Sequence, residues 1–449
     1  MREREQYQKV IRAAFCAVLL FLDGRLFRYV WMHYYSPLME TVFFRRGHWL
    51  VLSLYLIFLF AFIGIYGGWK AGYHRIVNLI SSHALGLLIA NVLSYIEIVA
   101  LTKKMVSVLP LSCLFVLEML ISLVWSIVCT RLYRMAYPPH RVLLIYEEKP
   151  DRYLLDKLKS RGDRISLAAE ISLREGMEAV LREMEQYSCV LIYDIPSRER
   201  NYILKQCYRR GIRCYLTPKL SDILIRSAEN QHLFDTPLYL CRNSSLTIER
   251  AFFKRLTDIL ISALGLLFFS PIMLLIALFI RFEDRGPVIY QQERLTKDGR
   301  HFHIYKFRSM REDAERDGRA RLAEKDDERI TAVGRFIRPF RLDELPQLWN
   351  ILLGEMSLVG PRPERPDIAA AYEKEIPEFS YRLKVKAGLT GYAQVYGKYN
   401  TTAYDKLKLD LMYIQNGSLM MDMEILLKTV QILFQRESAE GVRTEDRQE

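Results

Sequence analysis

The sequence predicts a membrane protein of mixed class, with apolar helices in its first third, an α/β domain in its centre and an α+β domain in its last part. Three observations support this prediction. The chain of 449 residues is 51% apolar and yet 26% charged, as expected for membrane segments joined to a water-exposed part. Apolar runs of about 20 residues, the length that spans a bilayer as a helix, are concentrated near the N-terminus. Short apolar runs alternate with amphipathic stretches after them, and densely charged motifs follow.

The charge balance narrows the range of partners. The formal net charge of +12 suits nucleic acid, anionic lipid or phosphorylated substrates. The sequence contains no DNA-reading motif and no Cys and His array with zinc-like spacing, so we expect no nucleic acid partner. Basic residues close to apolar segments favour membrane lipid and phosphorylated compounds. The seven scattered cysteines indicate reduced thiols rather than a disulfide framework.

Residues 1–135 are predicted to form a region of four transmembrane helices. The apolar segments are residues 10–29, 49–69, 76–101 and 105–130. The first segment is the weakest, because charged residues beginning at Asp23 interrupt it. Glu97 and Glu118 fall inside the third and fourth segments. An acid in such a segment is either functional, or it serves helix pairing or lies near the interface.

Residues 136–245 are predicted to form a Rossmann-like α/β domain. The predicted strands are residues 141–146, 165–171, 189–195 and 212–217, and the predicted helices are residues 151–161, 174–186 and 198–210. This alternation favours a parallel sheet. The first strand runs into Glu147-Glu-Lys-Pro150 instead of a glycine-rich loop, so the backbone cannot approach a pyrophosphate closely. We expect a structural, dimerising or regulatory role, and this domain makes a homodimer a reasonable expectation.

Residues 246–441 form the third predicted domain, and residues 442–449 a disordered tail. An apolar run at 259–280 carries Ser270-Pro271 in its middle. Proline removes a backbone donor and clashes with the preceding turn, so we expect the helix to kink there. The residues leave two outcomes open: a kinked fifth transmembrane helix, or a re-entrant helix whose charged ends return to one face. The sequence also predicts a strand pair turning at 297–300, a charged segment at 311–329 and an apolar helix at 419–434.

Two adjacent acids, Asp343 and Glu344, lie among arginines at the start of an apolar, helix-like run. A proline-rich turn containing Arg362 follows. Carboxylates able to hold a divalent metal, beside several guanidinium groups, suit a phosphorylated substrate. The residues alone also allow a plainer alternative, in which Asp343 is a helix N-cap and Glu344 a first-turn acid.

Six motifs follow one another in the last part of the chain: Lys254-Arg-Leu-Thr-Asp258, Ser270-Pro271, Tyr305-Lys-Phe-Arg-Ser-Met310, Leu342-Asp-Glu-Leu-Pro-Gln347, Met356-Ser-Leu-Val-Gly-Pro-Arg-Pro363 and Lys386-Ala-Gly-Leu-Thr-Gly-Tyr-Ala-Gln-Val395. In this order they resemble the catalytic domain of the bacterial polyprenyl-phosphate sugar-1-phosphate transferases, the monotopic phosphoglycosyl transferases. Lys408, Asp410 and Tyr413 extend the resemblance. The front of the chain is similar to the long exopolysaccharide-type members in architecture only.

This resemblance implies a re-entrant helix over about residues 251–282, broken at Ser270 and Pro271. It implies an active site on the cytoplasmic face of the bacterial inner membrane. The implied reaction moves a sugar-1-phosphate from a UDP-sugar to undecaprenyl phosphate and releases UMP, with Mg²⁺ as cofactor. Such a reaction starts exopolysaccharide, capsule or glycoconjugate synthesis, so downstream glycosyltransferases are expected partners.

The resemblance also implies the roles of the acid pair. Asp343 attacks the sugar-bearing phosphate and forms an aspartyl-phosphosugar intermediate. Glu344 holds Mg²⁺, which Asp343 could share, or assists the acceptor. A carboxylate nucleophile divides the transfer into two steps, which helps because donor and acceptor are both anionic.

The remaining expected site residues bind phosphate or shape the substrate pocket: Arg338 for the lipid phosphate, Arg308, Lys306 and Arg362 for phosphate or nucleotide, Gly391 and Gln394 for the nucleotide pocket, and Asp410 as a further acid. The planar guanidinium group of arginine matches phosphate geometry. Arg362 could instead fix the proline turn, and Asp410 could pair with Lys406 or Lys408.

Two other functions stay open as alternatives. One is a non-catalytic membrane scaffold or regulator of a polysaccharide assembly complex, and the intact pair Asp343 and Glu344 argues against it. The other is a polytopic glycosyltransferase that moves the sugar alone and releases UDP. The sequence does not identify the sugar that is transferred.

Overall fold

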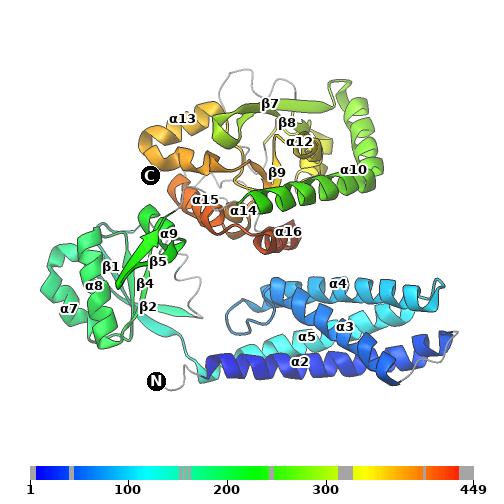
Figure 1. The fold of residues 1–449 in the computed structure, drawn as a ribbon, viewed down its shortest axis with the longest axis horizontal. Coiled ribbons are helices and arrows are strands. Elements are labelled where there is room, and N and C mark those ends of the chain that lie inside the picture. The colour runs from blue at the N-terminus through cyan, green and yellow to red at the C-terminus, as the bar shows by residue number, and fades with distance from the viewer. Residues whose placement is uncertain are drawn as a thin grey trace. The chain divides into compact units, whose positions relative to one another are not determined.

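The computed structural model describes residues 7–39, 45–150, 155, 158, 162, 164–241, 247–311, 327–397 and 401–433. By packing, the chain forms two compact units, Met1–Pro218 and Lys219–Glu449. Figure 1 shows the helices and strands of both units, coloured along the chain. The candidate site residues all lie in the second unit.

Four helices open the first unit and lie side by side: α2 (Gln8–Val30), α3 (Arg45–Ile65), α4 (Ile76–Thr102) and α5 (Leu109–Ala136) (Figure 1). After α2 the chain continues through a π-helical turn, η1 (Trp31–Tyr35), and a short 3-10 turn, η2 (Ser36–Leu38). A shared core that includes Phe27, Tyr55, Leu87 and Leu114 joins the four helices. The prediction of an N-terminal helical membrane region in a protein of mixed class is therefore confirmed.

Four helices of the described residues are long and apolar enough to cross a membrane: residues 46–65, 76–102, 109–136 and 248–284. The first predicted segment, residues 10–29, forms helix α2 but is not among them. Charged side chains explain the difference, because α2 carries Asp23 among several basic residues.

The second part of this unit is a four-stranded sheet. Its strands are β1 (His140–Tyr146), β2 (Ile165–Ser172), β3 (Cys189–Tyr193) and β4 (Arg213–Leu216), and its other elements are η3 (Leu173–Glu175), α7 (Met177–Met184) and α8 (Ser197–Arg210). The strand order is β2-β1-β3-β4, and every neighbouring pair is parallel. Apolar side chains such as Ile145 and Ile192 form its core. The predicted parallel sheet is confirmed, whereas the predicted helix at 151–161 lies almost entirely outside the described residues.

The second unit mixes helices with short strands. Its elements are α9 (Leu220–Arg226), β5 (Glu229–Leu233), β6 (Thr236–Leu240), α10 (Ile248–Asp284), β7 (Ile289–Leu295), η4 (Lys297–Gly299), β8 (His301–Phe307), α11 (Ala332–Ile337), η5 (Leu342–Glu344), α12 (Gln347–Leu353), β9 (Ser357–Val359), α13 (Pro366–Glu375), η6 (Pro377–Lys384), β10 (Gly388–Thr390), α14 (Tyr392–Tyr396), α15 (Ala403–Asn416) and α16 (Leu419–Leu433). Strands β7 and β8 are antiparallel and turn at η4, as predicted for the strand pair. Strands β9 and β10 are parallel. Helix α16 matches the helix predicted at 419–434 as far as it is described.

Two predicted segments lie outside the described residues. The charged segment at 311–329 is described only at its ends, and the tail at 442–449 is not described.

Helix α9 belongs by packing to the second unit, although it precedes the predicted start of the third domain at residue 246. Ile223 of α9 is buried in the same apolar core as Ile351 and Leu411. The hydroxyl of Ser227 donates a hydrogen bond to Oε1 of Gln415 at 3.2 Å. The core of the second unit therefore includes residues from before position 246.

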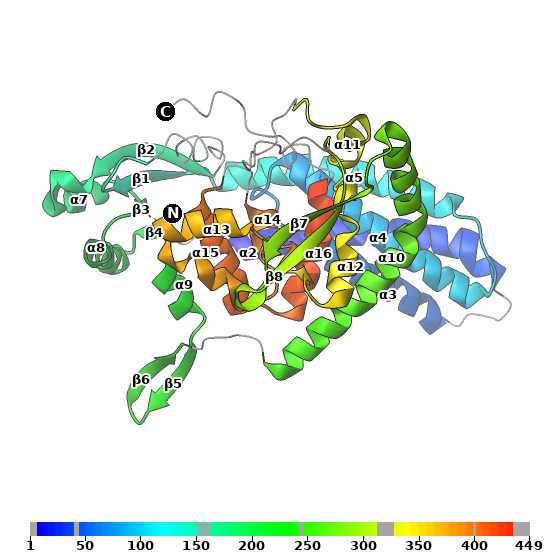
Figure 2. The same cartoon turned by 90° about the horizontal axis from the view of Figure 1, so that it is seen from above.

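Helix α10 is continuous over 37 residues, with Pro271 inside it. Figures 1 and 2 show that this helix bends along its length. Because Pro271 has no backbone N–H, the carbonyl of Leu267 loses its helical partner. The hydroxyl of Ser270 donates to that carbonyl at 2.8 Å and replaces the lost bond. Ser270 and Pro271 thus act as a pair. Pro271 removes the hydrogen bond to the Leu267 carbonyl, and Ser270 provides a replacement.

The two halves of α10 hold different parts of the second unit. In the first half, the Arg255 guanidinium donates to the carbonyls of Ile351 and Leu352 at 2.6 and 2.7 Å. These carbonyls lie in the last turn of helix α12, where carbonyls lack the regular bond four residues on, although that of Ile351 also accepts the Gly354 N–H at 3.0 Å. In the second half, Ile280 packs with Phe307 of β8 in a separate apolar cluster. Helix α10 therefore supports both α12 and β8, the two elements that flank the acid pair in space.

Candidate active site

The acid pair lies on a single 3-10 turn, η5, immediately before helix α12. Arg341 precedes the turn with a φ of 53°, in the left-handed region. Arg341 and Pro346 occupy the N-cap positions of η5 and α12. Neither acid caps a helix, so the alternative of a helix-capping Asp343 is wrong. The turn leaves Asp343 half-buried and Glu344 buried.

Glu344 is held between two cations that come from distant parts of the chain. Its Oε1 lies 3.2 Å from Nζ of Lys306 on β8 and 3.0 Å from an Nη atom of Arg362. Burial by itself would raise the pKa of the Glu344 carboxyl, but the charges of Lys306, Arg362 and Arg341 outweigh it and lower that pKa well below its ordinary value. Glu344 therefore stays ionised at every physiological pH.

The pKa of the Asp343 carboxyl is moved in the opposite direction. Burial, followed by the neighbouring charge of Glu344, raises the pKa of the Asp343 carboxyl to about 6. The charges of Lys306 and Arg338 act against this rise and limit it. Two adjacent carboxylates whose pKa values are moved in opposite directions are typical of a catalytic pair, in which each acid has its own role.

Arg341 connects the acid pair to helix α14. Its Nη1 donates a hydrogen bond to Oε1 of Gln394 at 3.2 Å. The amide nitrogen of Gln394 is buried and has no hydrogen-bond partner among the described residues. Gly391, just before α14, lets the backbone pack against Gly360, because a Cβ atom there would lie 2.1 Å from the carbonyl oxygen of Gly360. Four of the predicted site residues outside the pair, Lys306, Arg338, Arg362 and Gln394, thus act on the acid pair directly or through Arg341.

A second buried ion pair lies behind Arg362. Nη2 of Arg382 donates to Oδ2 of Asp410 at 2.7 Å and to the backbone carbonyl of Arg362 at 3.0 Å. Nη1 of Arg382 donates to Oε1 of Glu364 at 3.3 Å. Asp410 thus pairs with Arg382, and the alternative pairing with Lys408 is wrong because Lys408 pairs with Asp405. This network holds the backbone from which the Arg362 side chain reaches Glu344.

Arg382 was missed by the sequence reasoning. It stands in Tyr381-Arg-Leu-Lys384, just before the motif that starts at Lys386, and no local pattern distinguishes it from its exposed basic neighbours. The only signal available was its position beside a motif.

Arg308 makes an ion pair away from the acid pair. Its guanidinium is buried and pairs with Asp284 at the end of α10. This ion pair ties strand β8 to the bent helix. The phosphate contact expected of Arg308 stays a prediction.

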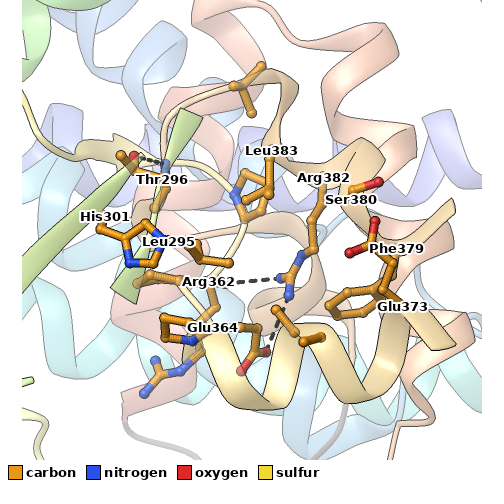
Figure 3. Close-up of a pocket in the computed structure, with 17 residues that line it drawn as sticks. Leu295, Thr296, His301, Arg362, Glu364, Glu373, Phe379, Ser380, Arg382 and Leu383 are labelled. Carbon is orange, nitrogen blue, oxygen red and sulfur yellow. Dashed lines mark hydrogen bonds and ion pairs between the residues drawn. The ribbon is translucent and has the colours of Figure 1, made fainter. Parts of the chain in front are cut away.

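A cavity of about 220 Å³ lies beside this network, between the β7–β8 turn, the Pro361–Pro363 turn, α13 and η6. Figure 3 shows Arg382 directed toward Glu364 and the backbone of Arg362 within it. The described lining includes neither acid of the pair and neither Gly391 nor Gln394. The cavity therefore lies behind the residues that hold Glu344, and its described lining does not include the acid pair.

No group of three or more His, Cys, Asp and Glu side chains in the described residues is placed to hold a metal ion. Asp343 and Glu344 supply two adjacent carboxylates. Mg²⁺ typically binds one or two protein carboxylates together with substrate phosphates and water. The donor set of the acid pair fits that requirement only when a phosphorylated substrate completes it.

The chain is similar to a known protein family and to several known proteins. The family described as "Bacterial sugar transferase" matches residues 249–436. A UDP-N-acetylgalactosamine-undecaprenyl-phosphate N-acetylgalactosaminephosphotransferase of Aeromonas hydrophila is 40% identical over 234 residues, covering 51% of this chain and 54% of the relative. A UDP-glucose:undecaprenyl-phosphate glucose-1-phosphate transferase of Klebsiella pneumoniae is 32% identical over 293 residues, covering 64% of this chain and 58% of the relative.

A shorter relative is matched over more of its length. The putative undecaprenyl-phosphate N-acetylgalactosaminyl 1-phosphate transferase of Bacillus subtilis (strain 168) is 48% identical over 130 residues, which are 29% of this chain and 72% of the relative. The match spans little more than half the length of the two longer relatives. The chain belongs to the bacterial sugar transferase family, that of the polyprenyl-phosphate sugar-1-phosphate transferases.

Proposed function

We propose that this protein transfers a sugar-1-phosphate from a UDP-sugar to undecaprenyl phosphate and releases UMP. The observation that carries this proposal is the acid pair, in which Glu344 is ionised between Lys306 and Arg362 while Asp343 stands beside it with a raised pKa. The names of the relatives support the two substrates. The reaction would start exopolysaccharide, capsule or glycoconjugate synthesis and hand its product to glycosyltransferases.

In the first step, a carboxylate oxygen of Asp343 attacks the phosphorus that bears the sugar. The bond from that phosphorus to UMP breaks, and UMP leaves with the electron pair. In the second step, a phosphate oxygen of undecaprenyl phosphate attacks the same phosphorus and releases the Asp343 carboxylate. Neither step takes up or releases a net proton. Asp343 must be ionised, because the carboxylate is the form that acts as the nucleophile. Arg338, whose charge already acts on Asp343, is the proposed contact for the lipid phosphate.

Asp343 and Glu344 are the proposed Mg²⁺ ligands. The ion would reduce the repulsion between the anionic donor, the anionic acceptor and the carboxylates. Lys306 and Arg362 hold the Glu344 carboxylate in one orientation before any ligand arrives.

The proposed setting is the cytoplasmic face of the bacterial inner membrane. Only 11% of the most apolar stretch of α10 is buried within the protein, which leaves its apolar surface free to contact lipid. The bend at Ser270 and Pro271 supports a re-entrant path with both helix ends on one face. The parallel sheet of the first unit supports a Rossmann-like domain, and we propose a homodimer through it.

The test is nucleotide release by the purified full chain in nanodiscs containing undecaprenyl phosphate, with Mg²⁺ and a panel of UDP-sugars. We expect UMP with one donor, and none from Asp343→Asn. The matched control is Asp298→Asn, the same substitution at an exposed turn position with positive φ that Asn tolerates. UDP as product would instead indicate glycosyl transfer, and no nucleotide from folded protein with any donor would favour the scaffold.

A further inference from the structure

The interior of the helical bundle α2–α5 contains two carboxylates that the proposed reaction does not use. Asp23 on α2 and Glu118 on α5 are fully buried. Phe27, one turn from Asp23 on α2, stacks on Tyr55, whose hydroxyl donates to Glu118, so the two acids lie in the same part of the bundle. Burying one ionised carboxylate without a partner is costly, and burying two together is more so. A folded bundle offsets that cost either by protonating the acids or by binding a cation.

Glu118 is held by donors from two other helices. The hydroxyl of Tyr55 on α3 donates to Oε1 of Glu118, and Nδ2 of Asn91 on α4 donates to Oε2 at 2.9 Å. The ring of Tyr55 stacks on Phe27, with centroids 3.9 Å apart, and Phe27 lies one turn from Asp23 on α2. All four helices therefore contribute a side chain to one polar cluster.

Several buried polar atoms of the cluster have no hydrogen-bond partner in the described structure. Both carboxylate oxygens of Asp23 and the amide oxygen of Asn91 are buried without a hydrogen-bond partner in the described structure. The hydroxyls of Ser94 and Ser122 are also unpartnered, and they lie one turn from Asn91 and Glu118 on their helices. Buried polar groups in folded proteins are almost always satisfied, so orphaned ones indicate an ion or water.

No cationic side chain among the described residues fills this role. Within the described part of the bundle, no lysine, arginine or histidine makes an ion pair or hydrogen bond with Asp23 or Glu118. The buried His83 on α4 is engaged with the backbone carbonyl of Gly68 at 3.2 Å. The positive charge must therefore come from outside the chain.

We propose that Asp23, Asn91 and Glu118 bind a small monovalent cation of the Na⁺ class, with the hydroxyls of Ser94 and Ser122 as further oxygen donors. A bound proton would satisfy one acceptor, whereas a cation satisfies several acceptors at once. All the proposed ligand atoms are oxygens, which suits a hard cation. A divalent ion fits less well, since no group of three acidic, histidine or cysteine side chains occurs among the described residues. This site is independent of the acid pair at Asp343 and of the proposed transferase reaction.

The test is equilibrium binding of radioactive sodium to the purified full chain in detergent, with choline replacing sodium at constant ionic strength. We expect saturable binding of one ion per chain, and a loss of affinity of at least tenfold in Asp23→Asn. Glu178→Gln, the same type of change at an exposed position of the first unit, is the control and should bind as the wild type does. A ligand that binds only the folded state also raises the unfolding temperature, so NaCl should stabilise the wild type more than choline chloride.

The wild-type measurements decide the proposal even if Asp23→Asn does not fold. Ser122→Ala removes one hydroxyl and should weaken sodium binding in a chain that keeps both acids. The proposal is overturned by wild-type protein without saturable sodium binding, by a site that takes Ca²⁺ or Mg²⁺ in preference to sodium, or by unchanged binding in folded Asp23→Asn.

Discussion

At the scale of single residues, the acid pair shows how environment separates two similar side chains. Asp343 and Glu344 are neighbours on one turn, yet among the described residues only Glu344 makes ion pairs, with Lys306 and Arg362. Its charge is therefore stable, and that same charge helps to raise the pKa of Asp343. The proposed nucleophile is the acid whose protonation is sensitive to pH.

The pH dependence of the reaction follows from Asp343. Because burial raises the pKa of this carboxyl to about 6, its nucleophilic, ionised form is lost as the pH falls through that value. We expect UMP release at limiting Mg²⁺ to fall about tenfold for each pH unit below this pKa. Initial rates between pH 5 and pH 8 measure this limb, and a rate that stays constant down to pH 5 would contradict it.

Arg382 provides a second prediction at this scale, as a positioning residue. Arg382→Lys keeps the charge near Asp410 but cannot keep all three contacts of the guanidinium, so the backbone of Arg362 should shift. We expect kcat to fall about tenfold or more, which corresponds to roughly 1.4 kcal/mol, with a small change in KM for the UDP-sugar. Arg300→Lys, at an exposed position, should change neither.

A purely structural role would give a different pattern for Arg382→Lys. The unfolding temperature would fall while the kcat of the folded fraction stayed at the wild-type value. Arg382→Gln is the severe case, because it leaves Asp410 buried without its partner, which typically costs about 3–5 kcal/mol.

At the scale of elements, helix α10, which is long and apolar enough to cross a membrane, contacts the elements that flank the acid pair. Its first half caps helix α12 through Arg255, and its second half packs on β8 and pairs Asp284 with Arg308. The bend at Pro271 lets one helix contact both elements.

Arg255→Met tests this link. The variant keeps an apolar stem but loses two charged hydrogen bonds to the α12 carbonyls, and each such bond typically contributes about 1.5–3 kcal/mol. We expect the unfolding temperature to fall by roughly 6 °C or more, since about 1 kcal/mol shifts it by 2–4 °C in a unit of this size. Arg300→Met, the same substitution at an exposed site, should leave it unchanged within experimental error. Equal unfolding temperatures for the two variants would show that the caps contribute little.

At the scale of the whole molecule, the chain is built from two compact units, and all the proposed catalytic residues lie in the second. The division by packing falls between Pro218 and Lys219, so α9 completes the core of the second unit. The helical bundle with its buried carboxylates lies in the first unit. Each unit therefore contains its own group of buried acidic side chains.

Truncation separates the contributions of the two units. We expect residues 219–449 to release UMP from a UDP-sugar, and residues 246–449 to be less stable because they lack Ile223, which is 3% exposed in the core. Loss of a buried isoleucine side chain typically costs about 2–5 kcal/mol. Unfolding temperatures and UMP release of both fragments measure the difference. A folded but inactive 219–449 fragment would show that the first unit is required for catalysis.

The sequence by itself determined the features that depend on local pattern. Alternating apolar runs such as 141–146 and 189–195 predicted the parallel sheet, because neighbouring residues decide whether a segment is a buried strand. The motif around Asp343 and Glu344 predicted the candidate site for a similar reason, since its acids and prolines are adjacent in the chain. The bend in α10 was predicted from a single proline at Pro271.

Only the tertiary structure decided which charges meet. Lys306 and Arg362 reach Glu344 from positions far away in the sequence, Arg308 pairs with Asp284, and Arg382 closes on Asp410. The buried acids Asp23 and Glu118 are likewise brought into the same part of the bundle from its first and last helices. The physical reason is that ion pairs and burial depend on distances across the fold, and those distances are set by the packing of the whole core rather than by any short segment.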